Sequence, residues 1–294
     1  MSSNSMDSIR LVDMAFDIFN QQMDTDYSRE NVEVKLITAK TADKEIAEFL
    51  MRYPEACEEQ MLESGYYREI KAEAFVTPKR YGIIVRTDIP DQGLQWRHVI
   101  LHEISHIYCI THELPDGENF FRKYCLDYAE SSFEDGMING GYAIWREFIA
   151  EYMARRLDID MVATTLKQNE KHMNLILEDI ENGAPDVKEC IEAVLIDTMA
   201  SKDILKAKDK PAAFDKFDRY EKLKSISWQG LLNTVYDQLY DESRAVYEID
   251  LEFIKSLGSN YLSLRTETMM KLVGGGTDED SSKKAMSILM GMNG

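Results

Sequence analysis

Residues 94–111 constrain the fold more than any other part of the chain. This run contains neither glycine nor proline and is rich in large apolar side chains, so it predicts a buried helix. At its centre, residues 102–106 read His-Glu-Ile-Ser-His. Because residues four apart on a helix lie above one another on the same face, His102 and His106 are expected to project side by side.

Two imidazoles at this spacing can bind one metal ion, each at about 2.0–2.1 Å. Glu103 adjoins the first of them and would lie beside the metal, where it would act as the general base toward a metal-activated water. The alternative interpretation is a helix that carries two incidental histidines on a packed face.

A hydrolytic metal site usually has a third protein ligand. No histidine follows at the His-x-x-Gly-x-x-His spacing, because residues 111–113 read Thr-His-Glu. Glu147 and Glu151 lie four apart in residues 142–157, a largely apolar run with helical spacing. Two semi-buried carboxylates need a cation or hydrogen-bond donors, so one could bind a metal while the other orients a ligating imidazole. The alternative is a solvated acidic pair near three arginines: Arg146, Arg155 and Arg156.

Other polar groups near these motifs are candidates for supporting roles. His98 lies one turn before His102, either as a group that supports a ligand or as an ordinary partly buried histidine. The expected strand at residues 82–87 would offer an edge to an extended peptide, unless it lies inside the sheet. An oxyanion needs a second donor besides the metal. The candidates for this donor are Tyr108, His112, Tyr142 and Tyr152.

Strand patterns are confined to about the first ninety residues. The expected strands are residues 32–38, 74–77 and 81–87. The last two are separated by Pro78-Lys79-Arg80, which predicts a hairpin. The expected helices before the motif are residues 8–22 and 42–53, and later segments have only helical patterns. This order predicts an α+β fold: an N-terminal part with a small β-sheet and the motif helix, followed by an all-α C-terminal region.

Turn-forming residues suggest the domain organisation. Loops are expected at residues 115–117 and 136–141, with a helix at residues 120–131 between them. The predicted divisions are a catalytic domain at residues 1–157, a helical region at 158–273 and a flexible tail at 274–294. The acidic segment 236–250 is either a structural helix or a surface that favours basic substrates.

Charge and composition exclude several classes of partner. The chain has 34 basic and 53 acidic residues, a net charge of −19, which disfavours nucleic acid and anionic lipid surfaces. Residues 1–7 lack the pattern of a signal peptide, and no run approaches the roughly 20 apolar residues of a membrane span. We therefore expect a cytoplasmic location and a protein or peptide partner. Four cysteines without a Cys-x-x-Cys pair predict reduced thiols: Cys57, Cys109, Cys125 and Cys190.

Taken together, the motifs at residues 102–106 and 147–151 resemble those of the gluzincin zinc metallopeptidases. The resemblance covers about residues 74–157 and implies a zincin-like N-terminal part. It implies one Zn²⁺ ion held by His102, His106 and Glu147, with Glu103 as the general base. Glu151 stands where these families have an aspartate that hydrogen-bonds a ligand histidine, and exchanged roles of Glu147 and Glu151 are the alternative.

Among gluzincin-like groups, the succession of short sheet, motif helix and glutamate helix is most similar to the ImmA/IrrE-like metallopeptidases. The predicted function is zinc-dependent hydrolysis of peptide bonds. One alternative is a non-catalytic binding or regulatory protein that keeps the zincin scaffold. Another is a helical interaction protein in which the His-Glu-x-x-His motif is coincidental.

Overall fold

The computed structural model describes residues 3–53, 70–77, 79–88, 94–112, 132–158, 234 and 250–272. Within these ranges the chain is mostly helical and has an α+β fold, with five helices and one small mixed sheet. None of the described helices is long and apolar enough to cross a membrane.

The chain divides into two compact units. The first comprises Met1–Leu114 with Ala150–Val162, and the second comprises Pro115–Ile149 with Ala163–Gly294. The predicted domain boundaries at residues 157 and 273 stay a prediction. Four features expected from the sequence lie outside the described residues: the helix at 120–131, the acidic segment 236–250 except its last residue, the tail at 274–294, and Cys57, Cys125 and Cys190.

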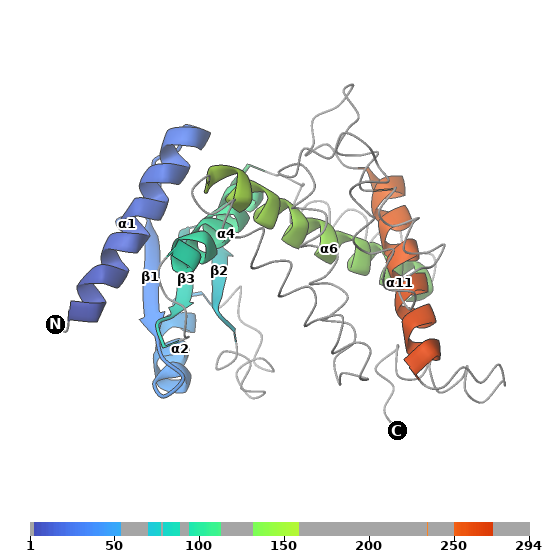
Figure 1. The fold of residues 1–294 in the computed structure, drawn as a ribbon, viewed down its shortest axis with the longest axis horizontal. Helices are drawn as coiled ribbons and strands as arrows, with labels where there is room; N and C mark the ends of the chain where they lie inside the picture. Colours follow the sequence, from blue (N-terminus) through green and yellow to red (C-terminus); the bar gives the residue numbers. More distant parts are fainter. Residues whose placement is uncertain are drawn as a thin grey trace. The chain divides into compact units, whose positions relative to one another are not determined.

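The elements of the first unit follow the sequence pattern closely (Figure 1). In chain order they are α1 (Ser3–Met23), β1 (Val32–Ile37), α2 (Ala42–Leu50), β2 (Ala72–Thr77), β3 (Arg80–Arg86) and α4 (Leu94–Thr111). The expected helices, the three strands and the hairpin are thereby confirmed. The main difference from the expected bounds is that α2 ends at Leu50, three residues earlier than expected, and is followed by a turn.

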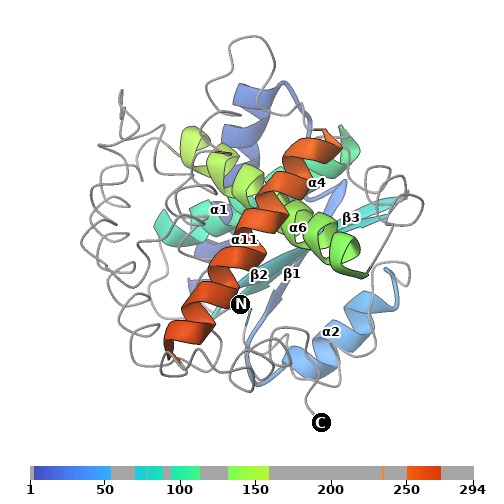
Figure 2. The ribbon, with the colours of Figure 1, turned by 90° about the vertical axis from the view of Figure 1, so that its right-hand side faces the viewer.

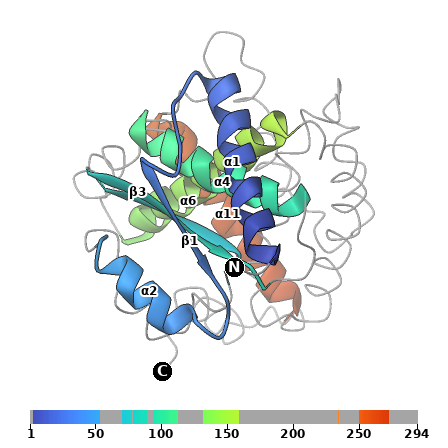
Figure 3. The same cartoon turned by 90° about the vertical axis from the view of Figure 1, so that its left-hand side faces the viewer.

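The sheet has the strand order β1-β3-β2, so β3 is its central strand. β3 pairs in parallel with β1, with Val34 opposite Ile83, and antiparallel with β2, with Ala74 opposite Ile83. Figure 3 shows β1 and β3 side by side. The expectation that residues 82–87 offer a free edge to a peptide is therefore wrong. Both hydrogen-bonding edges of that strand are already used within the sheet.

One face of the sheet packs against α2. A buried cluster joins residues of the three strands to the apolar side of the helix: Ile37, Ile46, Phe49, Leu50, Tyr53, Phe75 and Ile84. The hydroxyl of Tyr53 donates to the backbone oxygen of Tyr81 at 2.9 Å, which ties the turn after α2 to the central strand. Because strand side chains alternate, Ile83 and Val85 point to the opposite face.

On that opposite face α4 packs along β2 and β3, and α1 packs against α4. Aromatic rings join these elements. Phe19 of α1 meets Tyr108 of α4 edge to face, and Tyr27 meets Tyr81 of β3 in the same way. Ile100, Leu101, Ile104 and Ile107 of α4 are fully buried. The helix with the His-Glu-x-x-His motif is thus fixed on the sheet by its apolar positions, which leaves its histidine face for other partners.

In the second unit, the loop expected at residues 136–141 is instead part of a helix. α6 runs without interruption from Ser132 to Leu157 and includes Gly136, Gly140 and Gly141. Glycine usually weakens a helix, so the sequence pattern favoured a break. The physical reason for the difference is the neighbouring helix α11 (Leu251–Leu272), which crosses α6 in Figure 2.

The crossing brings the two helix backbones into direct contact. A Cβ atom added at Gly141 would lie 2.2 Å from the carbonyl oxygen of Ile254, and one added at Gly258 would lie 1.8 Å from that of Met137. Trp145 and Phe253 flank the contact with ring centroids 5.0 Å apart. The glycines therefore permit a close helix–helix approach, and packing outweighs their low helix propensity.

We predict that Gly141→Ala destabilises the protein by about 1–3 kcal/mol, because the new methyl group forces the α6 and α11 backbones apart. Urea denaturation followed by circular dichroism measures the change.

Gly136→Ala is the matched control, since it lies in the same helix and an added Cβ meets nothing within 4 Å. Replacing this glycine is expected to stabilise the helix by about 0.5–1 kcal/mol. Equal stability of the two variants would contradict the close-packing interpretation.

Candidate metal centre

Two helices present matching rows of polar side chains. On α4, His98, His102 and His106 follow one another at intervals of four residues. On α6, Glu147, Glu151 and Arg155 do the same. Residues at this spacing share a helix face, so each helix contributes one continuous stripe of titratable groups.

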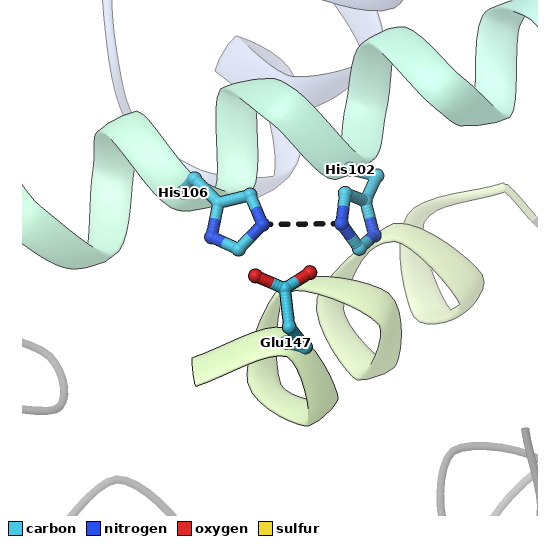
Figure 4. A group of neighbouring side chains, drawn as sticks. All are labelled: His102, His106 and Glu147. Carbon is cyan, nitrogen blue, oxygen red and sulfur yellow. Dashed lines mark hydrogen bonds between the residues drawn. The ribbon is translucent and has the colours of Figure 1, made fainter. Parts of the chain in front are cut away.

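The structure brings His102, His106 and Glu147 together (Figure 4). The Nε2 atoms of the two histidines are 3.1 Å apart, and the rings stand nearly perpendicular at 80°. One potential ligand atom from each of the three residues lies within 4.8 Å of the others. The group comprises two imidazole nitrogens and one carboxylate oxygen drawn from two different helices.

The hydrogen bonds of His102 fix which of its nitrogens faces this group. Its Nδ1 atom lies 3.1 Å from Oε2 of Glu151. An ionised carboxylate only accepts hydrogen bonds, so Nδ1 carries the proton and donates it. In a neutral imidazole the other nitrogen then bears the lone pair. Nε2 of His102 is therefore an acceptor, and it is directed toward Nε2 of His106.

The three residues could together hold a metal ion, and zinc serves as the test of their spacing. Two imidazoles with one carboxylate are a common donor set for zinc sites that keep an open position. Tetrahedral bonds of about 2.0–2.1 Å place neighbouring donor atoms about 3.4 Å apart. The observed separations, 3.1 Å between the imidazole nitrogens and at most 4.8 Å within the group, differ from this value by amounts that small side-chain rotations supply.

Glu151 is the buried centre of the arrangement. Its side chain is 13% exposed, and Arg155, one turn further along α6, donates from Nε to Oε1 at 2.5 Å. His98 and His102 supply the other hydrogen bonds. Burial raises the pKa of the Glu151 carboxyl. His98 and Arg155, together with the hydrogen bonds from both histidines, outweigh burial and hold this pKa well below its usual range.

Glu147 has a different environment from Glu151. Its side chain is 36% exposed, and Oε1 accepts a hydrogen bond from Nη2 of the exposed Arg146 at 3.2 Å. A solvated acidic pair is thus the wrong description of Glu151, whereas Glu147 is half-exposed beside one arginine. The more exposed carboxylate is the one that joins the two facing imidazoles, and the buried one holds His102 in orientation.

The remaining candidates occupy several environments. Glu103, next to His102 on α4, is 7% exposed. Tyr108 stacks on His112 with ring centroids 4.0 Å apart and also contacts Phe19 of α1. Tyr152 accepts a hydrogen bond from Nη1 of Arg156 at 2.6 Å. Tyr142 is half-buried on α6. These contacts place Tyr108 and His112 on the α1 side of α4, which disfavours them as oxyanion donors.

Sequence reasoning did not assign roles to two buried arginines, Arg155 and Arg97. Arg155 was noted only as a charge near the acidic pair, although its i, i+4 spacing from Glu151 is a recognisable signal for an ion pair. Arg97 pairs with the buried Asp158, which directly follows α6. No local pattern predicts that second pair, because its partners are 61 residues apart.

No protein-family model, curated protein or solved structure matches this chain. The functional conclusion therefore depends on the geometry and chemistry of the side chains.

We predict that Glu151→Gln lowers the free energy of unfolding by about 3–5 kcal/mol, since it removes the negative charge of a buried ion pair with Arg155. Urea denaturation in the presence of a chelator measures the loss without a metal contribution. The double variant Glu151→Gln, Arg155→Met is expected to lose less, because it removes both charges.

Arg146→Ala is the surface control for this prediction. It removes an exposed partner of Glu147 and is expected to change stability by less than about 1 kcal/mol. A loss from Glu151→Gln no larger than that from Arg146→Ala would contradict the assignment of Glu151 as a buried ion-pair centre.

Proposed function

We propose that this protein is a gluzincin-like zinc-dependent metallopeptidase, with His102, His106 and Glu147 as the zinc ligands and Glu103 as the general base. The observation that carries the proposal is the orientation of His102. Its Nδ1 atom is bonded to Glu151, so its Nε2 lone pair is directed toward His106 in a group that also contains Glu147. A packed face with two incidental histidines would not need a carboxylate that fixes the tautomer and orientation of one ring.

The donor set supports zinc among the transition metals, since imidazole and carboxylate ligands with an open position suit it well. A bound zinc ion would act as a Lewis acid that polarises a scissile carbonyl and acidifies a water molecule. The ionised Glu151 would keep the His102 ring in the ligating tautomer and orientation. Arg155 would balance the negative charge of Glu151.

The proposal gives Glu103 the role of proton carrier. It adjoins His102 on α4 and is 7% exposed, in a position that bulk water reaches poorly. In the proposed reaction its carboxylate takes a proton from the attacking water and delivers it to the leaving amine. The group of potential metal ligands among the described residues is His102, His106 and Glu147, so the proposal gives Glu103 a role distinct from ligation.

An extended peptide is the proposed substrate. β3 is internal, but β2 pairs only with β3 in the part of the chain that the structure describes, and α4 packs along β2. A strand of peptide added to β2 would gain backbone hydrogen bonds and run beside the helix that carries His102 and His106.

We predict about one zinc ion per chain in the purified protein. His106→Ala and Glu147→Ala are each expected to lose it, because two remaining ligands hold the metal poorly. Elemental analysis after dialysis measures the content. Arg146→Ala is the control next to Glu147 and is expected to keep its zinc.

Retention of zinc in Glu147→Ala would move the third ligand to another carboxylate and contradict this assignment. Failure of the wild-type protein to take up added zinc would contradict the proposed function as a whole.

We predict that Glu103→Gln keeps the zinc but slows peptide hydrolysis by on the order of 10²–10⁴-fold, since it removes the base and leaves the ligands in place. Cleavage of a mixed peptide library, read by mass spectrometry, measures the rate with both proteins at equal zinc content. Hydrolysis at the wild-type rate in Glu103→Gln would overturn the mechanism. Zinc binding without hydrolysis in the wild type would instead favour the non-catalytic regulatory alternative.

A further inference from the structure

His98 takes part in an arrangement of four side chains that the proposed chemistry does not yet use. His98 and His102 lie one turn apart on α4, and Glu151 and Arg155 lie one turn apart on α6. The carboxylate of Glu151 contacts each of the other three. One acidic side chain therefore receives donors from two helices.

The donors divide between the two carboxylate oxygens. Arg155 bonds to Oε1 at 2.5 Å and His102 bonds to Oε2 at 3.1 Å. Nε2 of His98 lies 3.1 Å from both oxygens. His98 is thus the one member of this set that bridges the two oxygens, and its contact opposes rotation of the carboxylate about its terminal bond.

The two nitrogens of His98 have unequal surroundings. Nε2 must donate, because an ionised carboxylate only accepts. Nδ1 is buried and has no hydrogen-bond partner within the described residues. The Nε2–H group aimed at Glu151 is therefore the one donor of this ring that has an acceptor among the described residues.

We propose that His98 is a positioning residue for the metal centre: it holds the Glu151 carboxylate in the orientation at which Oε2 accepts from Nδ1 of His102. This inference rests on the proposed zinc site. His98 acts through Glu151 and His102 and touches neither the metal nor the substrate. Groups that orient a ligating histidine in this indirect way typically change metal affinity by 10–100-fold when they are removed.

The arrangement favours a positioning role over simple packing. A packing role needs only an apolar side chain of similar volume, which would leave no buried nitrogen without a partner. The imidazole at position 98 keeps such a nitrogen and directs its one donor to the carboxylate that orients His102. The useful property of the ring is therefore its N–H group.

The test compares two replacements of His98 in the full-length protein. His98→Leu keeps apolar volume and removes the donor, whereas His98→Gln keeps an N–H group that can reach Glu151. Zinc affinity is measured by competition with a chelator. We expect His98→Leu to bind zinc 10–100-fold more weakly than the wild type and His98→Gln to bind within about threefold of it. Thermal melting in excess chelator checks that each variant folds.

Cys109→Ala is the matched packing control. The thiol of Cys109 contacts Met153, so the change also weakens packing between α4 and α6 but leaves Glu151 and its donors alone. It is expected to lower the melting temperature while zinc affinity stays at the wild-type value.

A double-mutant cycle adds a measurement that a purely structural role would not affect. If His98 acts through Glu151, His98→Gln and His98→Leu should bind zinc equally in a Glu151→Leu, Arg155→Met background, because the acceptor that only one of them can contact has been removed. The same 10–100-fold difference between them in both backgrounds would overturn the proposal.

The outcomes separate this inference from the proposed function. Zinc binding by the wild type with equal affinity in His98→Leu would overturn the positioning role alone. Equal weakening in His98→Leu and His98→Gln would reduce His98 to a packing residue and overturn it as well. Absence of zinc binding in the wild type would overturn both the proposed function and this inference.

Discussion

The buried carboxylate of Glu151 is the interaction on which the rest of the candidate site depends. The side chain of Glu151 is 13% exposed. Its carboxylate accepts hydrogen bonds from two histidines of α4 and from one arginine of α6. Without those donors an ionised group at this depth would be strongly unfavourable. With them, the carboxylate holds α4 and α6 in one register, and it fixes the tautomer of His102. The same contacts therefore stabilise the packing of α4 against α6 and orient a candidate metal ligand.

The sequence predicted local features well, because they depend on spacing along one element. The helix with His102 and His106 and the hairpin of β2 and β3 follow from apolar periodicity and from turn residues. The pairing of Glu147 and Glu151 with that helix required the motif pattern as well. Their distinct environments, one half-exposed and one buried, depend on how α6 meets α4 and were left open by the sequence.

The failures of sequence reasoning have a common physical cause, which is that distant segments decide the outcome. Gly141 lies within α6 because the backbone of α11 approaches it, and no local signal encodes that approach. β3 is internal because β1 pairs with it from about fifty residues upstream. Arg97 and Asp158 meet across 61 residues. In α6 the tertiary contact overrides the low helix propensity of glycine, and in the other two cases no local pattern encodes the contact.

The unequal environments of the three proposed ligands suggest how a metal would enter. His102 is held by Glu151, and His106 is 9% exposed on a helix packed against the sheet, so neither imidazole has much freedom. Glu147 is the most exposed of the three, and Nη2 of the exposed Arg146 donates to its Oε1. Exposed ion pairs of this kind contribute little free energy and exchange readily. The two histidines would therefore form the more constrained part of the site, and the more exposed Glu147 would complete the ligand group. Because both helices are already formed, metal binding would not require them to fold around the ion.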